Sequence, residues 1–268
     1  MRRALVTTML SLAMFDCLSQ VGKGIDKKAI ICLTYDDALE SHVKVAIPQL
    51  DSLGLKATFF LNSIKGSTEV AGLGEPTILL WKKAAQSGHE LGNHTLFHPC
   101  PEKFGWQKEL AIEGYTLESL MKEIELTNLF LKSLDGQSKE RVFAYPCNNT
   151  IVQGIDYSMK LKETKLVKYA RTGGDKTSII KDFKLVDPMK IPSWFVAEGT
   201  TLNELIAFAK EVKEKGKMGV YQFHGIGSPL FRLSPGVHKQ FLEYLNAHKE
   251  DYWVTTISEA MDVVTRND

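Results

Sequence analysis

Residues 29–42 read AIICLTYDDALESH and place two adjacent aspartates directly after an apolar run. The run from Ala29 to Leu33 is rich in β-branched and large apolar residues, which is typical of a buried strand. A carboxylate at the mouth of such a strand loses hydration, and this costs free energy unless a partner compensates the charge. Asp36 and Asp37 therefore need partners. Either one of them caps a following helix while the other is solvated, or both serve a functional site.

Strand-like and helix-like segments alternate along the rest of the chain, which at 268 residues is long enough for one large α/β domain. The segments expected to form strands are residues 29–35, 56–62, 89–95, 141–146, 218–225 and 252–256. The segments expected to form helices are residues 40–54, 77–88, 116–136, 158–170, 200–216 and 234–248. This alternation predicts parallel strands joined by crossover helices, but it does not distinguish an open sheet from a closed barrel.

In both architectures, functional residues gather where the parallel strands end. Polar groups follow four of the expected strands: Asp36 and Asp37, then His94 and His98, then the stretch 145–148, and finally His224. Because these strand ends meet at one edge of the sheet, the sequence predicts a single shared site.

His94 and His98 belong to the stretch GNHTLFHPC, residues 92–100. One helical turn would bring two imidazoles with this spacing to the same side, within reach of one ion. Such a pair on a loop is by itself weak evidence, and two solvated histidines are the simplest alternative. With an aspartate from another strand end, however, two histidines and one carboxylate leave open positions for water and substrate, as in a catalytic zinc site.

Adjacent side chains that leave a strand point to opposite sides, so Asp36 and Asp37 need not share a partner. One aspartate can bind a metal while the other accepts a proton from metal-bound water. His224 leaves an apolar strand at a turn that contains Gly225 and Gly227. A histidine there is as often a buried structural residue as a catalyst, but at this shared strand end it could protonate a leaving group.

Charge and composition exclude nucleic acid as an expected partner. The chain carries 33 lysines and arginines against 32 aspartates and glutamates, without a basic run. Two arginines precede a moderately apolar N-terminal stretch, which predicts a signal peptide over residues 1–19 and a single domain over residues 20–268. The expected location is therefore secreted or periplasmic, and an N-terminal extension that is not cleaved is the alternative.

The chain has four cysteines, Cys17, Cys32, Cys100 and Cys147. Removal of the signal peptide would leave three, an odd number that excludes a fully paired disulfide framework. Cys32 lies in the apolar run of the first strand and is expected to be a buried, inert thiol.

Taken together, these residues resemble the polysaccharide deacetylase family, the NodB homology domain of carbohydrate esterase family 4, over about residues 28–264. TYDDA resembles the first motif of the family, and HTLFH resembles the second. FAYPC stands at the place of the third motif, and QFH at the place of the fifth. The resemblance implies an α/β fold, a distorted (β/α) barrel of about seven parallel strands.

The resemblance also implies metal-dependent hydrolysis of an acetyl group from an N-acetyl sugar or an O-acetylated glycan. The implied roles are general base for Asp36, general acid for His224, and metal ligands for Asp37, His94 and His98. Zinc is the expected ion, with cobalt, manganese or nickel as alternatives. The backbone N–H of Cys147 would donate to the oxyanion, and Tyr145 would border the substrate pocket.

The chain departs from the family pattern at several positions. The arginine of the third motif, which orients the base, is replaced by Ala144, and its aromatic residue by Cys147. The leucine of the fifth motif is replaced by Gln222, and we identify no clear fourth motif. The candidates to fill these roles are Arg171 for the missing arginine, Asp175 as a support for His224, and Trp194 as an aromatic wall or an ordinary core residue.

Cys100 and Cys147 both flank the expected site, so they could form a disulfide in an oxidising compartment. Two other functions remain open. The missing arginine and altered pocket would suit a non-catalytic carbohydrate-binding protein on the same fold. The same scaffold could instead hydrolyse another small amide, as allantoinase-like relatives do.

Overall fold

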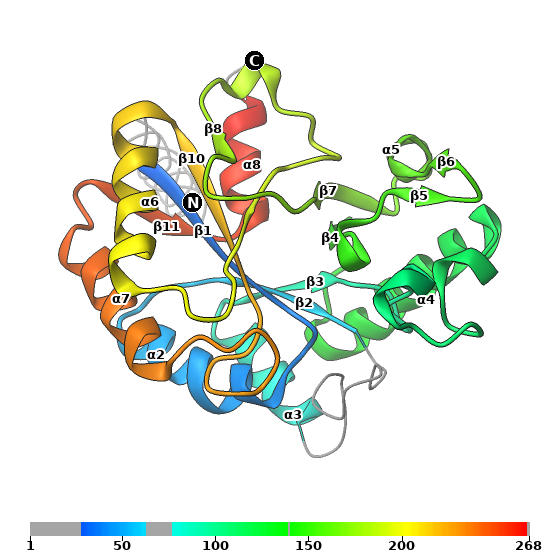
Figure 1. Cartoon of the computed structure of the whole chain (residues 1–268), viewed down its shortest axis with the longest axis horizontal. Coiled ribbons are helices and arrows are strands. Elements are labelled where there is room, and N and C mark those ends of the chain that lie inside the picture. The colour runs from blue at the N-terminus through cyan, green and yellow to red at the C-terminus, as the bar shows by residue number, and fades with distance from the viewer. Residues whose placement is uncertain (1–27, 63–76, 139, 267–268) are drawn as a thin grey trace, which may run out of the picture.

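The computed structural model describes residues 28–62, 77–138 and 140–266, so the expected signal peptide lies outside the described residues. Among these residues, no helix is long and apolar enough to cross a membrane. A nine-stranded sheet forms the centre of the molecule, with its main path in the order β7-β4-β3-β2-β1-β10-β8. The sheet is curled into part of a barrel, with most of the helices around its outside (Figure 1), so the predicted distorted (β/α) barrel is confirmed.

Seven parallel strands carry the sheet: β1 (Ala29–Asp36), β2 (Thr58–Leu61), β3 (Glu90–Asn93), β4 (Arg141–Ala144), β7 (Val167–Arg171), β10 (Met218–Phe223) and β11 (Tyr252–Thr255). Short β9 (Trp194–Phe195) pairs in parallel with β10, and β8 (Ile179–Ile180) pairs antiparallel with it. A separate hairpin consists of β5 (Ile151–Val152) and β6 (Ile155–Asp156).

The α-helices are α2 (Ile47–Ser52), α3 (Ile78–Gln86), α4 (Leu117–Asp135), α5 (Ser158–Thr164), α6 (Leu202–Lys215), α7 (Pro235–Ala247) and α8 (Ile257–Arg266). A π-helical turn, η1 (His42–Ala46), precedes α2, and four short 3-10 turns lie in the loops: η2 (Glu102–Phe104), η3 (Ile112–Gly114), η4 (Pro146–Asn148) and η5 (Phe183–Leu185). The predicted helix over residues 158–170 is wrong in its second half. Lys165 adopts a left-handed conformation with φ 53°, which ends α5, and the following residues pair with β4.

Strand β1 lies in the interior of the sheet, and all eight of its residues are buried. Its odd-numbered side chains, such as Ile31 and Leu33, pack into the core cluster that also includes residues of α2, α6 and α7. Its even-numbered side chains Ile30 and Cys32 pack with Val142, Tyr169, Val220 and residues of α8 on the other face. Side chains alternate along a strand, so Asp36 lies on the face of Ile30 and Cys32, inside the curled sheet.

Candidate active site

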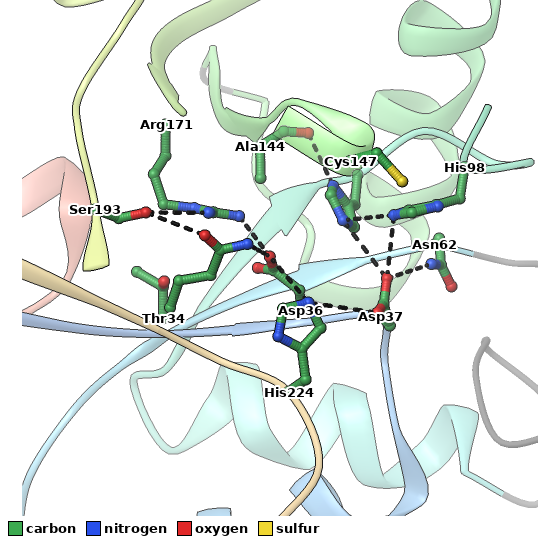
Figure 2. Close-up of polar contacts among 12 residues, drawn as sticks. Thr34, Asp36, Asp37, Asn62, His98, Ala144, Cys147, Arg171, Ser193 and His224 are labelled. Carbon is green, nitrogen blue, oxygen red and sulfur yellow. Dashed lines mark hydrogen bonds and ion pairs between the residues drawn. The ribbon is translucent and has the colours of Figure 1, made fainter. Parts of the chain in front are cut away.

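The seven parallel strands end at one side of the curled sheet, and the candidate residues lie at several of these ends. Figure 2 shows side chains from the ends of β1, β3, β7 and β10 that point toward one another, as the position of the strand ends predicts. Those of Asp36, Asp37, His94, His98 and His224 border a cavity of about 470 Å³, which is also lined by Phe104, Trp106, Phe195 and Phe231. The cavity therefore has a polar floor and aromatic walls.

The candidate metal ligands Asp37, His94 and His98 converge on one point. Asp37 Oδ1 lies 3.5 Å from His94 Nε2 and 3.3 Å from His98 Nε2, and the two imidazole nitrogens are 3.0 Å apart. All three side chains are almost fully buried, with at most 9% of each residue exposed. Asp37 Oδ1, His94 Nε2 and His98 Nε2 therefore form a triangle whose sides are all 3.0 to 3.5 Å long.

The donor set fits a divalent cation. Burial lowers the pKa of both His94 and His98 to about 4, so both imidazoles are neutral near pH 7. His94 Nδ1 donates to the carbonyl of Ala144 at 2.8 Å, which leaves the Nε2 lone pair free. Lone pairs from a carboxylate and a neutral imidazole thus meet within hydrogen-bonding distance, and they would repel one another without a cation between them.

Asp37 is held in this position by its neighbours. Its backbone N–H donates to the carbonyl of Phe60 at 3.1 Å, and Asn62 Nδ2 donates to its Oδ1 at 3.1 Å. Burial raises the pKa of Asp37 above its ordinary value, although His224 and His94 partly offset this effect. A bound cation would compensate the same buried charge.

Asp36 has a different set of partners (Figure 2). Arg171 Nη2 donates to Asp36 Oδ2 at 2.6 Å, and Gln222 Nε2 donates to the same oxygen at 2.9 Å. Burial by itself would raise the pKa of Asp36, but the Arg171 charge, followed by His94, His224 and the Gln222 hydrogen bond, lowers it to about 2. The other oxygen, Oδ1, is buried and has no hydrogen-bond partner in the part of the chain that the structure describes.

The register of the sheet explains how Arg171 reaches Asp36. Ala144 of β4 is paired with Arg171 of β7, so the two side chains stand side by side on the inner face. Arg171 therefore approaches Asp36 from β7, the strand next to the one that carries Ala144. Ala144 occupies the position at which the third motif of the resembled family has its arginine. The Arg171 guanidinium also lies over the Phe60 ring at 5.1 Å, and its Nη1 donates to Ser193 Oγ at 3.3 Å.

The loop that carries His94 and His98 is fixed by a buried glutamate of α4. Glu123 Oε1 accepts hydrogen bonds from the backbone N–H groups of Leu96 and Phe97 at 2.9 and 2.8 Å. Within the loop, the N–H of His98 donates to Thr95 Oγ1 at 2.9 Å. The two histidines are thus presented by a turn in which three successive backbone N–H groups have hydrogen-bond partners.

His224 lies across the site from the histidine pair. Its Nε2 is 3.9 Å from both Asp36 Oδ2 and Asp37 Oδ2, and its ring contacts the rings of Phe195 and Phe231. The carbonyl of His224 accepts a hydrogen bond from His42 Nε2 at 2.7 Å, which fixes the backbone at the end of β10. His224 therefore faces both Asp36 and Asp37, from the side of the site opposite His94 and His98.

The structure corrects the expectation for Asp175 and decides between the two interpretations of Trp194. Asp175 is exposed, and its carboxylate accepts hydrogen bonds from the N–H and the hydroxyl of Thr177 in its own turn, so it does not support His224. Trp194 packs in the core against Phe208 and Tyr221, so its alternative interpretation as a core residue holds. Alternation along β9 turns the next side chain, Phe195, toward the cavity instead.

The third motif forms a tight turn, η4, at the edge of the cavity. Tyr145 and Cys147 both border the cavity, but the Tyr145 hydroxyl donates to the Met189 carbonyl at 2.9 Å and its ring packs against Tyr157. Cys147 is joined to Cys100 by a disulfide with a Cα–Cα distance of 5.6 Å. The pairing considered from sequence is therefore present, and Cys32 is the free, buried cysteine expected in the core.

The model of the polysaccharide deacetylase family matches residues 23–157, which include Asp36, Asp37, His94, His98 and Cys147. The chain belongs to the polysaccharide deacetylase family. The matched range ends before Arg171, Gln222 and His224, so these residues of the site lie outside it. No curated protein sequence matches this family member.

Several solved structures share the fold of this chain. A family 4 acetyl xylan esterase from Clostridium thermocellum, in complex with cobalt, is 16% identical with a TM-score of 0.54, covering 88% of this chain and 91% of that one. The catalytic domain of a peptidoglycan N-acetylglucosamine deacetylase from Eubacterium rectale is 15% identical with a TM-score of 0.55, covering 86% and 90%. A mutant of BA3943, a CE4 family pseudoenzyme with restored activity, is 17% identical with a TM-score of 0.54, covering 88% and 68%.

Several residues of this deacetylase-family site were not identified as such from sequence. The sequence indicates Gln222 only as a departure from the family leucine, and it does not indicate Asn62, Ser193 or His42. Asn62 and Gln222 lie at or next to strand ends, so the position that identified the other residues was a usable signal for both. Ser193 and His42 have no such signal, because their roles depend on contacts across the fold.

Proposed function

We propose that the chain is a metal-dependent deacetylase that hydrolyses an acetyl group from an N-acetyl sugar or an O-acetylated glycan. The observation that carries this proposal is the arrangement of the two aspartates. Asp37 joins a triangle of metal-ligand atoms, whereas Asp36 is held through Oδ2 and keeps a buried Oδ1 without a partner among the described residues. This division of roles suits a ligand and a base.

Asp37, His94 and His98 would hold the cation, and zinc suits two neutral imidazoles and one carboxylate with open positions for water and substrate. When bound, the cation polarises the acetyl carbonyl and lowers the pKa of a coordinated water. The chain supplies the rest of the chemistry through fixed hydrogen-bonding groups.

Asp36 would accept a proton from the attacking water through Oδ1. Arg171 and Gln222 hold the other oxygen, so the carboxylate does not rotate away, and the low pKa of Asp36 keeps it ionised at neutral pH. The N–H of Cys147, at the edge of the cavity, would donate to the oxygen of the tetrahedral intermediate. His224, on the opposite wall, would protonate the departing amine or alkoxide.

Export of the protein belongs to the same proposal. The disulfide between Cys100 and Cys147 requires an oxidising compartment, which supports secretion or periplasmic location through the N-terminal residues 1–19.

The test combines metal analysis with acetate release from chitin oligomers, peptidoglycan and acetylxylan. The zinc-loaded protein should release acetate from at least one of them. Asp36→Asn should retain zinc and lose activity by at least about 100-fold, because the base is removed and the ligands remain. His94→Ala should instead lose zinc.

Two outcomes would contradict the proposal. Zinc bound with no acetate released from any acetylated glycan would favour a carbohydrate-binding protein. Loss of zinc from Asp36→Asn would show that the roles of the two aspartates are wrongly assigned.

A further inference from the structure

The disulfide between Cys100 and Cys147 joins the two loops that form one wall of the candidate site. Cys100 follows His98 by two residues, and Cys147 occupies the turn whose N–H is the proposed oxyanion donor. The two cysteines are 47 residues apart in sequence, and their loops follow β3 and β4. A single covalent bond thus connects a metal-ligand loop to an oxyanion turn.

Both connected loops have unusual backbone conformations. His98 has φ 49° and Cys147 has φ 50°, in the left-handed region that residues other than glycine rarely adopt. Asn148, next to Cys147, has φ 55°. Such conformations cost free energy and persist only where the surroundings enforce them. The disulfide is a covalent restraint placed between these two loops, where such enforcement is needed.

The disulfide also contacts a metal ligand directly. Cys100 Sγ lies 3.5 Å from His98 Nδ1, within hydrogen-bonding distance for sulfur. A disulfide sulfur has no hydrogen to donate, so the contact is favourable when His98 carries its proton on Nδ1 and keeps the Nε2 lone pair for the metal. In the same way, the carbonyl of Ala144 accepts a hydrogen bond from His94 Nδ1, which leaves the Nε2 lone pair of His94 free. A reduced Cys100 thiol could donate to Nδ1 and would favour the opposite tautomer.

We propose that Cys100 and Cys147 are positioning residues, whose disulfide holds His98 and the Cys147 N–H in their working geometry. Breaking this bond weakens metal binding and activity together, so the enzyme requires oxidised cysteines. The activity part rests on the proposed function, whereas the metal part does not. The competing explanation is a disulfide that only stabilises the fold, as disulfides do by restricting the unfolded chain.

The experiment compares oxidised wild type, the double variant Cys100→Ala and Cys147→Ala, and wild type reduced with a phosphine. In the reduction, the S–S bond breaks and each cysteine becomes a free thiol. The phosphine is oxidised to its oxide with the oxygen of one water molecule, whose two hydrogens go to the thiols. A phosphine is chosen because dithiol reductants bind zinc. The measurements are zinc affinity, the visible absorption spectrum of the cobalt-loaded protein, acetate release and thermal unfolding.

Leu245→Ala is the matched control for a general loss of stability. Leu245 is a buried core residue near the C-terminal end of α7, 1% exposed, and is absent from the residues that line the cavity. This variant should lower the unfolding temperature while zinc affinity and the cobalt spectrum remain those of wild type.

The expected result is zinc affinity about 10- to 100-fold weaker in the double variant and in the reduced protein, with a changed cobalt spectrum. Reoxidation of the reduced protein should restore both. Zinc affinity and spectrum equal to those of wild type, in the double variant or the reduced protein, would overturn the proposal. If the double variant does not fold, the reduced wild type decides by the same criteria. Failure of the proposed function looks different, because oxidised wild type would then bind zinc and release no acetate.

Discussion

Replacing Arg171 by methionine tests what holds Asp36. The Arg171 side chain is 0% exposed, and its guanidinium lies 2.6 Å from the Asp36 carboxylate. Methionine fills much of the same space with an adaptable, uncharged side chain, so the main change is loss of the ion pair. Asp36 would then remain buried with only the Gln222 amide on its Oδ2.

The size of the effect follows from the pKa of Asp36. Burial raises this pKa, yet the surrounding charges, with Arg171 first, lower it from 3.8 to about 2. One pKa unit corresponds to about 1.4 kcal/mol, so the fold stabilises the ionised carboxylate by about 2 kcal/mol net. Arg171 is the largest of the influences that oppose burial and keep this carboxylate ionised. Removing one partner of a buried ion pair costs about 3–5 kcal/mol of stability.

The sign of the pH dependence can be worked out in the metal-free protein. The pKa of Asp36 is lower in the folded state, so its stabilisation is complete above about pH 4 and is lost as the pH falls toward 2. In Arg171→Met the folded-state pKa rises, since burial is no longer offset by Arg171. Denaturation measured at several pH values should therefore show a smaller loss of stability between pH 4 and 2 than in wild type.

The kinetic assay measures acetate release and zinc affinity in the same preparations. Arg171→Met should lower kcat/KM by about 100-fold, because a base that is no longer oriented loses its alignment with the attacking water. Its acid limb should move to higher pH. Zinc affinity should stay unchanged, since the hydrogen bonds of Arg171 go to Asp36 and Ser193 rather than to the metal ligands.

A matched rescue uses the pairing of Ala144 with Arg171 between β4 and β7. Ala144→Arg combined with Arg171→Ala exchanges the large and the small side chain between these paired positions. The guanidinium then stands on the adjacent strand, and the total side-chain volume is unchanged. The kcat/KM of this double variant should be at least about tenfold higher than that of Arg171→Ala alone. The reasoning is refuted if Arg171→Met keeps the activity and the acid limb of wild type.

Further predictions concern the other contacts of the site. Gln222→Leu removes one hydrogen bond to a charged oxygen, so kcat should fall by about 10-fold or more with zinc affinity unchanged, as measured by acetate release and zinc titration. Asn62→Ala removes the support of Asp37 and should weaken zinc binding by about 10- to 100-fold in the same titration. The pKa values of His94 and His98 are about 4, so zinc affinity, measured against pH, should not be reduced by their protonation until the pH approaches 5.

The main elements of the fold could be predicted from local patterns. The apolar run that ends in Asp36 is β1, and the expected strands 56–62, 141–146, 218–225 and 252–256 overlap β2, β4, β10 and β11. These patterns are readable because each strand buries its own side chains and ends at a polar group. Helix α8 is not among the expected helices, and among the seven parallel strands the exception is β7. Its residues were assigned to a helix, since pairing with β4 over a few residues leaves no strong local signature.

The candidate site was predictable only in part. The aspartates and the histidine pair occupy strand ends, and His224 could be placed with them by the same rule. Sequence spacing does not reveal which side chains meet across the sheet, so the contact of Gln222 with Asp36 went unrecognised. Asp175 and Trp194 were misplaced or left open for the same reason, because a side chain's face depends on the strand register and on its neighbours.

The sequence by itself determined most of the alternation of strands and helices and the chemical groups at the strand ends, because both depend on residues close together in the chain. Only the tertiary structure decided what orients Asp36. Register between β4 and β7 sets Arg171 beside Ala144 on the inner face, and register between β1 and β10 places Gln222 within reach of the same carboxylate. These contacts join residues 135 and 186 positions apart, and such distant pairs are fixed by packing of the whole sheet rather than by local preference.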